Sequence, residues 1–251
     1  MRLEGKTALV TGGSRGLGRT MSLALAKEGA TVIVNYLHNQ EGANKVVEEI
    51  EAQGGTAFSI QADITKEESV ARLIREMNHL SGSDVDILVN NATGPQPELS
   101  IEQSTWEDYE NQLTFFVKAP LLLLKEVLPV MKEKGQGSII NIGSEVVQTG
   151  NAFFANYVTA KSAMLGMTRS WASELGPYGI RVNLVNPGFT PVERHQDVSA
   201  EAIEEYRKQV PLQRMGKPED IASAVVYLAS EESSFVTGQS ISINGGHTFS
   251  I

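Results

Sequence analysis

Residues 7–18 read TALVTGGSRGLG, a short apolar run that leads directly into a glycine-rich turn. The apolar run predicts a buried strand, and the apolar spacing from Gly18 to Glu28 predicts a helix that ends at Gly29. Glycines let the backbone turn sharply and approach a diphosphate, while the first N–H groups of the following helix point at that anion. The stretch therefore predicts a strand–turn–helix unit that binds a dinucleotide.

The same glycines have a rival interpretation as the phosphate loop of nucleoside triphosphatases. Residues 13–20 nearly fit its pattern, Gly-x-x-x-x-Gly-Lys-Ser/Thr. However, Arg19 stands where the lysine would reach the terminal phosphates, and no clear apolar run ends in a metal-binding Asp. The sequence thus favours the dinucleotide interpretation.

Outward from this turn, short apolar runs alternate with amphipathic stretches. Such alternation predicts an α/β fold, a Rossmann-type doubly wound sheet of about seven parallel strands with helices on both faces. No linker or repeat interrupts residues 1–251, so we expect a single domain. We expect strands at 7–10, 31–34, 57–61, 86–89, 138–142, 180–185 and 240–243, helices at 18–28, 41–53, 66–80, 155–175, 201–209 and 218–229, and a mostly helical stretch at 101–134.

The composition sets further limits on function. The chain has 251 residues, 41% of them hydrophobic, and a formal net charge of −9. These values exclude a disordered chain and argue against nucleic acid or an anionic membrane as a partner. The chain has no Cys, and its scattered His residues do not predict a metal site. Because neither a membrane span nor a signal peptide is recognisable, we expect a cytoplasmic protein.

The end of the second expected strand bears on the choice of nucleotide. Sites for NAD usually place an Asp or Glu there to bind the adenine ribose 2′-OH. Here the stretch Asn35-Tyr36-Leu37-His38 contains no acid, and Arg15 and His38 are basic groups that can face a 2′-phosphate. The sequence therefore predicts NADP(H) rather than NAD(H), with Tyr36 and His38 among the residues that bind it.

Tyr157 and Lys161 have the i, i+4 spacing that puts a phenol and an ammonium on one face of an expected helix. A tyrosine ordinarily titrates far above pH 7, and an adjacent cation lowers its pKa. Ser144 follows an expected strand, where its hydroxyl can hydrogen-bond a substrate carbonyl. Because ligands bind at the carboxyl ends of parallel strands, these residues predict a proton-transfer site there.

Taken together, these features resemble the short-chain dehydrogenase/reductase family over essentially the whole chain, and most of all its 3-oxoacyl-(acyl carrier protein) reductase-like group. The resemblance implies an NADP(H)-dependent oxidoreductase that reduces a ketone to a secondary alcohol by hydride transfer. The motifs that carry it are the glycine loop at 11–18, Asp63-Ile64, Asn90-Asn91-Ala92, Ser144, Tyr157 with Lys161, Asn186-Pro187-Gly188 and the closing stretches 214–220, 236–238 and 244–246.

The resemblance also implies roles for particular residues. Tyr157 would be the general acid, Lys161 would hold the nicotinamide ribose and tune Tyr157, and Ser144 would orient the carbonyl. The implied cofactor-binding residues are Gly12, Ser14, Arg15, Gly16, Leu17, Gly18, Asp63, Ile64, Asn90, Ala92, Tyr157, Lys161, Pro187, Gly188 and Thr190.

The chain departs from the family pattern in the helix before the fifth strand, where the family carries a catalytic Asn. Counting back from the Val117-Lys-Ala-Pro120 stretch puts Phe116 at that position, whereas counting from Trp106 reaches Leu113, and we prefer Phe116. The water-mediated proton relay that Asn supports is then in doubt. Gln112 or Asn111 is a hypothetical substitute, but we favour solvent-facing positions for both.

Two further departures concern the cofactor groove and the segment that would cover it. Thr93 replaces the glycine of the family's Asn-Asn-Ala-Gly motif, which predicts a reshaped groove with Gly94 adjusting the loop. The family often carries a Thr at the position of Val192, so Thr190 is the expected cofactor contact instead. Residues 190–215 would form the substrate lid, within which Arg194 or His195 would meet an anionic substrate unless both are ordinary surface charges. His79 and His247 are interpreted as surface or terminal residues.

The substrate and the partners remain open at this point. An acyl carrier protein is acidic and would need a basic patch, for which Lys132, Lys134 and Arg169 are candidates. Gly135 and Tyr178, however, stand where related reductases tend to carry arginines, so a small-molecule carbonyl is an equal choice. The resemblance implies a homotetramer that pairs the helices at 113–134 and 155–175 at one interface, and the last strand and tail at another.

Two other functions stay open. Phe116 and Thr93 would suit a nucleotide-binding sensor or partner protein that kept the fold and lost turnover. A different chemistry on the same fold, such as dehydration or epimerisation, is the third interpretation, because fold does not determine function.

Overall fold

The structure is a computed structural model that describes residues 1–196 and 198–249. Its strands form one parallel sheet in the order β3-β2-β1-β4-β5-β6-β7. The fold class expected from the sequence, a doubly wound α/β sheet, is confirmed. The strands are β1 (Thr7–Val10), β2 (Thr31–Tyr36), β3 (Thr56–Gln61), β4 (Ile87–Asn90), β5 (Gly137–Ile142), β6 (Ile180–Pro187) and β7 (Ser240–Ile243).

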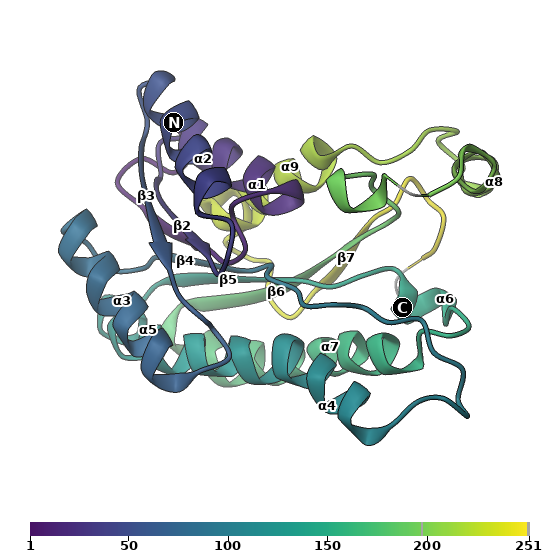
Figure 1. Ribbon diagram of the computed structural model, residues 1–251. Helices are drawn as coiled ribbons and strands as arrows, with labels where there is room; N and C mark the ends of the chain where they lie inside the picture. Colours follow the sequence, from purple (N-terminus) through teal and green to yellow (C-terminus); the bar gives the residue numbers. More distant parts are fainter. Residues whose placement is uncertain (197, 250–251) are drawn as a thin grey trace.

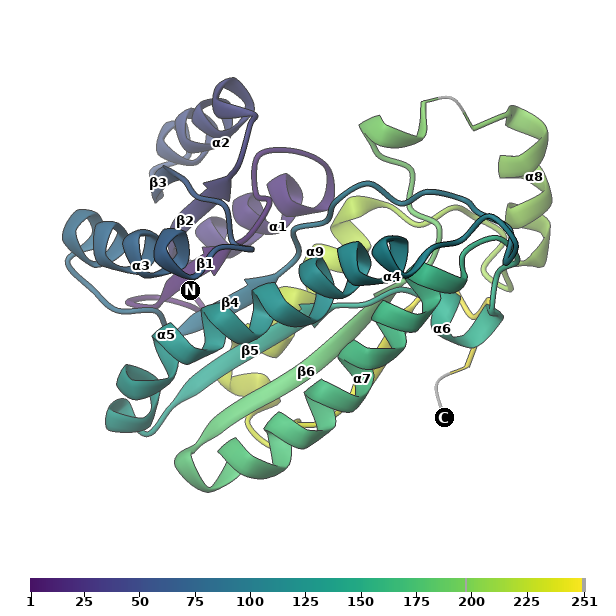
Figure 2. The same cartoon turned by 60° about the horizontal axis from the view of Figure 1, so that its bottom comes forward.

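Helices cover both faces of this sheet (Figure 1). They are α1 (Gly16–Lys27), α2 (Gln40–Ala52), α3 (Glu67–Ser81), α4 (Trp106–Leu113), α5 (Ala119–Lys134), α6 (Val146–Thr149), α7 (Ala155–Leu175), α8 (Ala200–Gln209) and α9 (Pro218–Ala229). Helices α3, α5 and α7 lie on one face, and α1, α2 and α9 lie on the other (Figures 1 and 2).

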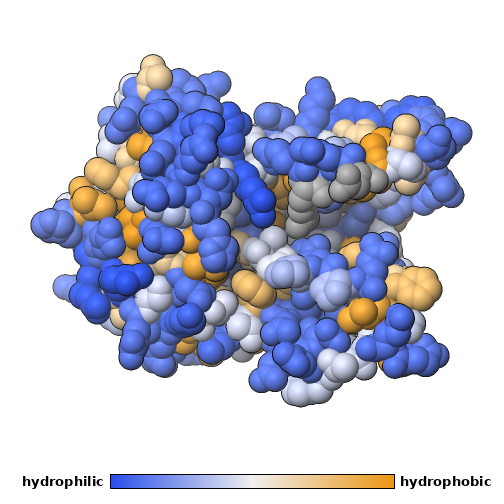
Figure 3. Space-filling view, in the orientation of Figure 1, coloured by the Kyte–Doolittle hydropathy of each residue, from blue (hydrophilic) through white to orange (hydrophobic). Residues whose placement is uncertain are grey.

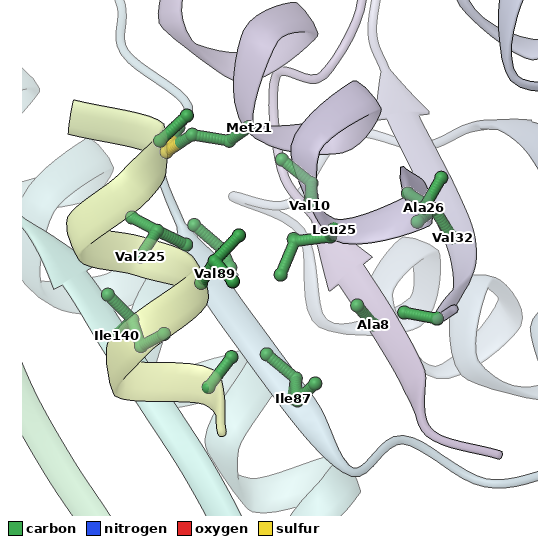
Figure 4. Close-up of a cluster of buried hydrophobic side chains, with 14 of the residues drawn as sticks. Ala8, Val10, Met21, Leu25, Ala26, Val32, Ile87, Val89, Ile140 and Val225 are labelled. Atoms are coloured by element: carbon green, nitrogen blue, oxygen red, sulfur yellow. The ribbon is translucent and has the colours of Figure 1, made fainter. Parts of the chain in front are cut away.

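The period of two along each strand decides which face a side chain reaches. In β1, Leu9 packs toward α3, α5 and α7, whereas Val10 packs toward α1 and α9. Figure 4 shows Val10 in the second of these layers, near Leu25 of α1. Because both faces are covered, β1 and β4 are buried along their whole length and read as continuous apolar runs.

The stretch expected to be helical over 101–134 is divided in the structure. It begins at α4, where Thr105 and Asp108 form a reciprocal capping box, so residues 101–105 lie outside the helix. A π-helical turn, Thr114–Lys118, then joins α4 to α5. In α5, Leu123 and Leu124 are buried while Leu121 is 42% exposed, so this protein's own core covers most of the leucine run.

The order of the strands places a switch point between β1 and β4. The chain winds outward from β1 through β2 to β3 and then returns to β4 on the other side of β1. Loops that follow β1 and β4 therefore diverge at the carboxyl edge of the sheet and leave a crevice there, which is where ligands bind in such folds. Among the described residues, no helix combines the length and apolar character that crossing a membrane requires.

Candidate active site

The turn between β1 and α1 is built around glycines. Gly12 and Gly16 have positive φ angles of 63° and 54°, and a Cβ on Gly18 would lie 2.1 Å from the carbonyl oxygen of Gly12. Arg15 is exposed at the start of α1, and its side chain makes no capping hydrogen bond to the helix. The turn therefore leaves the first N–H groups of α1 open to an anion.

Hydrogen bonds join this turn to the end of β4. The Thr11 hydroxyl accepts hydrogen bonds from the backbone N–H groups of Asn91 (2.9 Å) and Ala92 (3.0 Å). The Asn91 amide donates to the Thr11 carbonyl at 2.8 Å, and a Cβ on Gly12 would be 3.0 Å from the Ala92 Cα. The two sides of the switch point are thus held at a set separation.

The adjoining crevice contains a buried polar atom that makes no hydrogen bond within the described residues. Asn90 donates its side-chain N–H to Asn141 at 2.8 Å, but its buried Oδ1 has no hydrogen-bond partner among the described residues. Asn90 lines a small hollow with Thr11, Ile64 and Ala92. A glycine cradle that a Cβ would fill, beside an unsatisfied amide oxygen, fits a dinucleotide cofactor.

The expected adenine-side residues lie at the same edge. Tyr36 ends β2 and is buried, while His38 is exposed in the following loop. Asp63 follows β3 and accepts hydrogen bonds from the Thr65 N–H (3.0 Å) and hydroxyl (2.6 Å). Burial opposes its ionisation, yet the hydrogen bonds from Thr65, together with Lys66, hold the pKa of Asp63 below its usual range. Asp63 is thus charged at neutral pH.

Tyr157 and Lys161 lie in the first two turns of α7, and both are buried. The Lys161 ammonium donates to the carbonyl of Ile142, the last residue of β5, at 2.7 Å. It also lies 5.6 Å from the centre of the Tyr157 ring. Ser144 follows two residues after Ile142 and is partly exposed. Lys161 thus ties the helix that carries the phenol to the strand that leads to Ser144.

Comparisons with known proteins agree with this arrangement. A family model described as Enoyl-(Acyl carrier protein) reductase matches residues 12–248. The 3-oxoacyl-(acyl-carrier-protein) reductase FabG of Staphylococcus epidermidis is 40% identical over 243 residues, which cover 96% of this chain and 98% of that protein.

Solved structures with a similar fold include dehydrogenases. A 7α-hydroxysteroid dehydrogenase complexed with NADH and 7-oxo glycochenodeoxycholic acid is 34% identical, with a TM-score of 0.92 over 98% of this chain and 95% of that one. A mutant short-chain dehydrogenase/reductase of Serratia marcescens is 34% identical, with a TM-score of 0.91 over 99% of this chain and 100% of that one. The chain belongs to the short-chain dehydrogenase/reductase family. It is an oxidoreductase that uses a nicotinamide cofactor.

In this short-chain dehydrogenase/reductase an aromatic ring lies beside Lys161. Phe116 is 2% exposed, and its ring centre lies 3.8 Å from the Lys161 Nζ. The same ring meets Tyr157 edge-on at 5.5 Å, and Phe154 meets Tyr157 edge-on at 5.8 Å. The assignment of Phe116 rather than Leu113 to the family's Asn position stays a prediction.

The solvent-facing placement expected for Gln112 is wrong. Gln112 is 2% exposed and donates to the Pro95 carbonyl at 2.7 Å, because the loop after β4 packs over this face of α4. Its Oε1 is buried without a hydrogen-bond partner among the described residues. Asn111 is exposed, as expected.

The other two departures concern loops over the crevice. Thr93 is exposed and accepts a hydrogen bond from Gln96 at 2.8 Å, while a Cβ on Gly94 would lie 2.1 Å from the Phe115 ring. The buried Thr190 donates to the Gly188 carbonyl at 3.1 Å. Val192, rather than Thr190, approaches the glycine turn, within 3.6 Å of where a Cβ on Gly16 would be.

The expected basic patch does not lie beside this crevice. Lys132 and Lys134 end α5 just before β5 begins, so they sit at the amino edge of the parallel sheet, opposite Tyr157. Lys134 pairs with Asp86 at 3.1 Å, and the Lys132 ammonium lies over the Tyr178 ring at 4.2 Å. Arg169 is also far along α7 from Tyr157. The side chain of Arg194 lies outside the described residues, as do residues 250–251 of the tail expected at a subunit interface.

Sequence reasoning missed one buried cluster at the carboxyl edge. Glu145, directly after Ser144, is 7% exposed and accepts a hydrogen bond from the Tyr206 hydroxyl at 2.6 Å. Its other oxygen lies 3.1 Å from the Nδ1 of His247, whose interpretation as an ordinary surface or terminal residue is therefore wrong. The acid next to Ser144 is the only sequence signal that pointed here. The surface is hollowed between the region of α8 and that of α4 and α6 (Figure 3).

Proposed function

We propose that this short-chain dehydrogenase/reductase is an NADP(H)-dependent reductase of ketones in which Tyr157 gives the proton. The observation that carries this proposal is the buried Lys161, held at 2.7 Å by the Ile142 carbonyl one helical turn from Tyr157. A buried ammonium beside a phenol favours the phenolate, so Tyr157 can release its proton near neutral pH.

The bound nicotinamide supplies the hydride, and the protein supplies position and charge. Gly12, Gly16 and Gly18 would surround the pyrophosphate, with Ser14, Arg15 and Leu17 beside it. Asp63 and Ile64 would meet the adenine. Asn90, Ala92, Pro187, Gly188 and Thr190 would line the path toward Tyr157 and Lys161.

The side chains at the carbonyl have separate tasks in this proposal. The Ser144 hydroxyl donates to the carbonyl oxygen and shares its developing negative charge. The Tyr157 O–H gives its proton to that oxygen as the alcohol forms, and Lys161 stabilises the resulting phenolate. In the reverse direction, the Tyr157 phenolate takes the proton of the alcohol.

The preference for NADP(H) over NAD(H) rests on charge. Arg15 and His38 are both exposed in the loops after β1 and β2, which end at the same sheet edge. The Ser14 carbonyl lies 2.8 Å from where a Cβ on Gly42 would be, so the turn after β1 lies close to the first turn of α2, into which the loop after β2 leads. A 2′-phosphate between these loops would meet the positive charge of Arg15, and the end of β2 has no carboxylate that would repel it.

The substrate that fits best is a small ketone or a 3-oxoacyl thioester. The relatives named 3-oxoacyl-(acyl-carrier-protein) reductase support a thioester. Lys132 and Lys134 lie at the opposite sheet edge and would not guide an acidic acyl carrier protein to Tyr157. We therefore place the free thioester ahead of the carrier-bound form. Residues 190–215 would act as the lid over the hollow.

A homotetramer belongs to the same proposal. Leu121, 42% exposed on α5, and Phe235, whose side chain is fully exposed before β7, are apolar groups that a second copy could cover. Size-exclusion chromatography with light scattering tests this, since a monomer would contradict it.

The second candidate, a nucleotide-binding protein without turnover, is favoured by one observation. Phe116 occupies the space beside Lys161 where the family's Asn would hold water, at 3.8 Å from the ammonium. Tyr157→Phe separates the two candidates.

The test is consumption of NADPH with a short 3-oxoacyl thioester, compared with NADH and with Tyr157→Phe. The proposal expects NADPH to be consumed, at least a thousandfold slower turnover in Tyr157→Phe, on the order of a lost acid–base group, and unchanged nucleotide binding in that variant. Preference for NADH would contradict the cofactor assignment. Nucleotide binding without turnover across a panel of ketones would favour the second candidate.

A further inference from the structure

Helix α8 is held to the molecule mainly by polar contacts. No residue of α8 is fully buried, so little apolar burial secures it. One polar side chain of α8, Tyr206, points inward. Its hydroxyl donates a hydrogen bond to the Glu145 carboxylate at 2.6 Å. The same hydroxyl accepts a hydrogen bond from the Phe189 N–H at 2.8 Å. Tyr206 therefore links α8 to both the β5 loop and the segment after β6.

The C-terminal segment converges on the same carboxylate. His247 lies with its Nδ1 3.1 Å from Glu145, while its Nε2 lies 3.3 Å from the Gln209 side chain at the end of α8. The rings of His247 and Tyr206 are 4.7 Å apart. Helix α8, through Tyr206, and the C-terminal segment, through His247, thus meet at one buried acid.

The backbone on both sides of the Glu145–Tyr206 contact is closely packed. The Glu145 N–H donates to the carbonyl of Pro187, the last residue of β6, at 3.1 Å. A Cβ on Gly188 would lie only 2.7 Å from the Tyr206 hydroxyl, so this contact requires the glycine. A shift of α8 would therefore change the contact between Tyr206 and Gly188, which is one of the residues proposed to line the cofactor site.

The Tyr206 hydroxyl must stay protonated in order to donate its hydrogen bond to Glu145. Burial, together with the hydrogen bond to Glu145, raises the pKa of Tyr206 well above its usual range. The phenol thus stays protonated, and so a hydrogen-bond donor, at neutral pH. The Glu145 side chain in turn has a partner at each of its two oxygens, Tyr206 and His247, as a buried polar group requires.

We propose that Glu145 is a positioning residue that fastens α8 and residues 244–249 to the loop carrying Ser144. Glu145 holds α8, and the adjacent Ser144 binds the substrate carbonyl. The closure of α8 over the substrate and the placement of Ser144 are therefore coupled. The attachment of α8 to Glu145 does not depend on the proposed function, whereas its effect on catalysis rests on that function.

The fastening is tested by amide hydrogen exchange over residues 200–209 and 241–249. Tyr206→Phe keeps the ring and removes both the hydrogen bond to the Glu145 carboxylate and the one accepted from the Phe189 N–H. We expect this variant to speed exchange in α8 by roughly 10- to 100-fold. Exchange in β4 and β5 should stay unchanged. Tyr227→Phe is the matched control, because Tyr227 lies on α9 and is 37% exposed. Equal exchange in wild type and Tyr206→Phe would overturn the proposal.

Variants at Glu145 separate a positioning role from general destabilisation. Glu145→Gln keeps an oxygen for Tyr206 and an N–H for His247, so it should retain slow exchange in α8, whereas Glu145→Ala should lose it. Glu205→Ala, an exposed acid on α8, controls for lost charge. Equally fast exchange in the Gln and Ala variants would contradict the link. Should Glu145→Ala not fold, Tyr206→Phe decides alone.

The catalytic consequence has its own readout. With a ketone that the wild type reduces, Tyr206→Phe should raise KM roughly tenfold or more while the Kd for NADPH, measured by fluorescence, changes less than about twofold. An unchanged KM would overturn the coupling to Ser144. Absence of any reductase activity in the wild type would reject the proposed function and leave the exchange test intact.

Discussion

At the residue level, the contact between Lys161 and the Phe116 ring is the feature of the site that most invites a test. The Phe116 ring centre lies 3.8 Å from the ammonium, close enough for a cation–π attraction in a buried place. This contact restrains the lysine at the place where the family resemblance implies an Asn side chain. The ring also packs on Tyr157, so one side chain touches both members of the pair.

A substitution at Phe116 tests this contact. Phe116→Leu keeps an apolar side chain but removes the π face, so we expect kcat/KM to fall about tenfold, as for a loss of about 1–2 kcal/mol. Phe154→Leu, which removes the other ring packed on Tyr157, should cost less. Steady-state kinetics on both variants decides, and equal losses would show that packing on Tyr157 matters rather than the contact with Lys161.

Arg15 carries the second prediction at this scale. Arg15→Ala should raise the KM for NADPH roughly tenfold or more, because a charge-assisted hydrogen bond to a phosphate is lost. The KM for NADH should change little, since that cofactor has no 2′-phosphate. Kinetics with both nucleotides measures the ratio. Lys27→Ala, at the far end of α1, is the control. Parallel losses for the two nucleotides would assign Arg15 to the pyrophosphate instead.

At the scale of the element, the start of α9 depends on one acid. The Asp220 carboxylate accepts a hydrogen bond from the Lys217 N–H at 2.8 Å and pairs with Arg214 at 2.6 and 2.9 Å. The Arg214 guanidinium, against some burial, holds the pKa of Asp220 below its usual range. A lowered pKa in the folded state stabilises the protein above the ordinary pKa, and this contribution is lost as the pH falls through the folded value.

The pH dependence of Asp220→Asn follows from that sign. At pH 7 the variant should unfold at lower urea, by an amount on the order of 1 kcal/mol. The difference from wild type should shrink as the pH falls below about 4, where the wild-type carboxylate becomes protonated. Urea titrations at several pH values measure it. Glu219→Gln, on the same turn, controls for lost charge near the helix start, and a difference independent of pH would contradict the ion pair.

At the scale of the whole molecule, the two apolar layers share one sheet. Leu9 lies in the layer under α3, α5 and α7, and Leu25 lies in the layer between the sheet and α1 with α9; both are fully buried. Because β1 contributes to both layers through alternating residues, loss of either layer should destabilise the same strand.

Core variants test whether the layers unfold together. Leu9→Ala and Leu25→Ala should each destabilise the protein by about 2–5 kcal/mol and shift one common thermal transition. Calorimetry provides the measurement, with Leu212→Ala, 63% exposed, as the control. Separate transitions that respond to only one variant each would show that the layers are independent.

The strands and most helices were predictable because their signals are local. Helices α7 and α9 and strand β7 have the expected bounds, and the glycine turn lies between β1 and α1. A strand that is buried on both faces appears in the sequence as a short continuous apolar run, and a helix that is buried along one stripe appears as an apolar period of 3.6 residues. By contrast, the π turn at Thr114–Lys118 and the short helix α6 leave no such period, so the sequence did not indicate them.

The sequence alone determined the parallel α/β fold, the glycine turn and the Tyr157–Lys161 spacing, since each depends on residues close together in the chain. Only the tertiary structure decided that Phe116 lies on Lys161, that Gln112 is buried, and that Lys132 lies at the far sheet edge. It also decided that Glu145 meets Tyr206 and His247. These contacts join segments that approach one another only when the sheet has formed, and one sequence carries no record of which distant residues become neighbours.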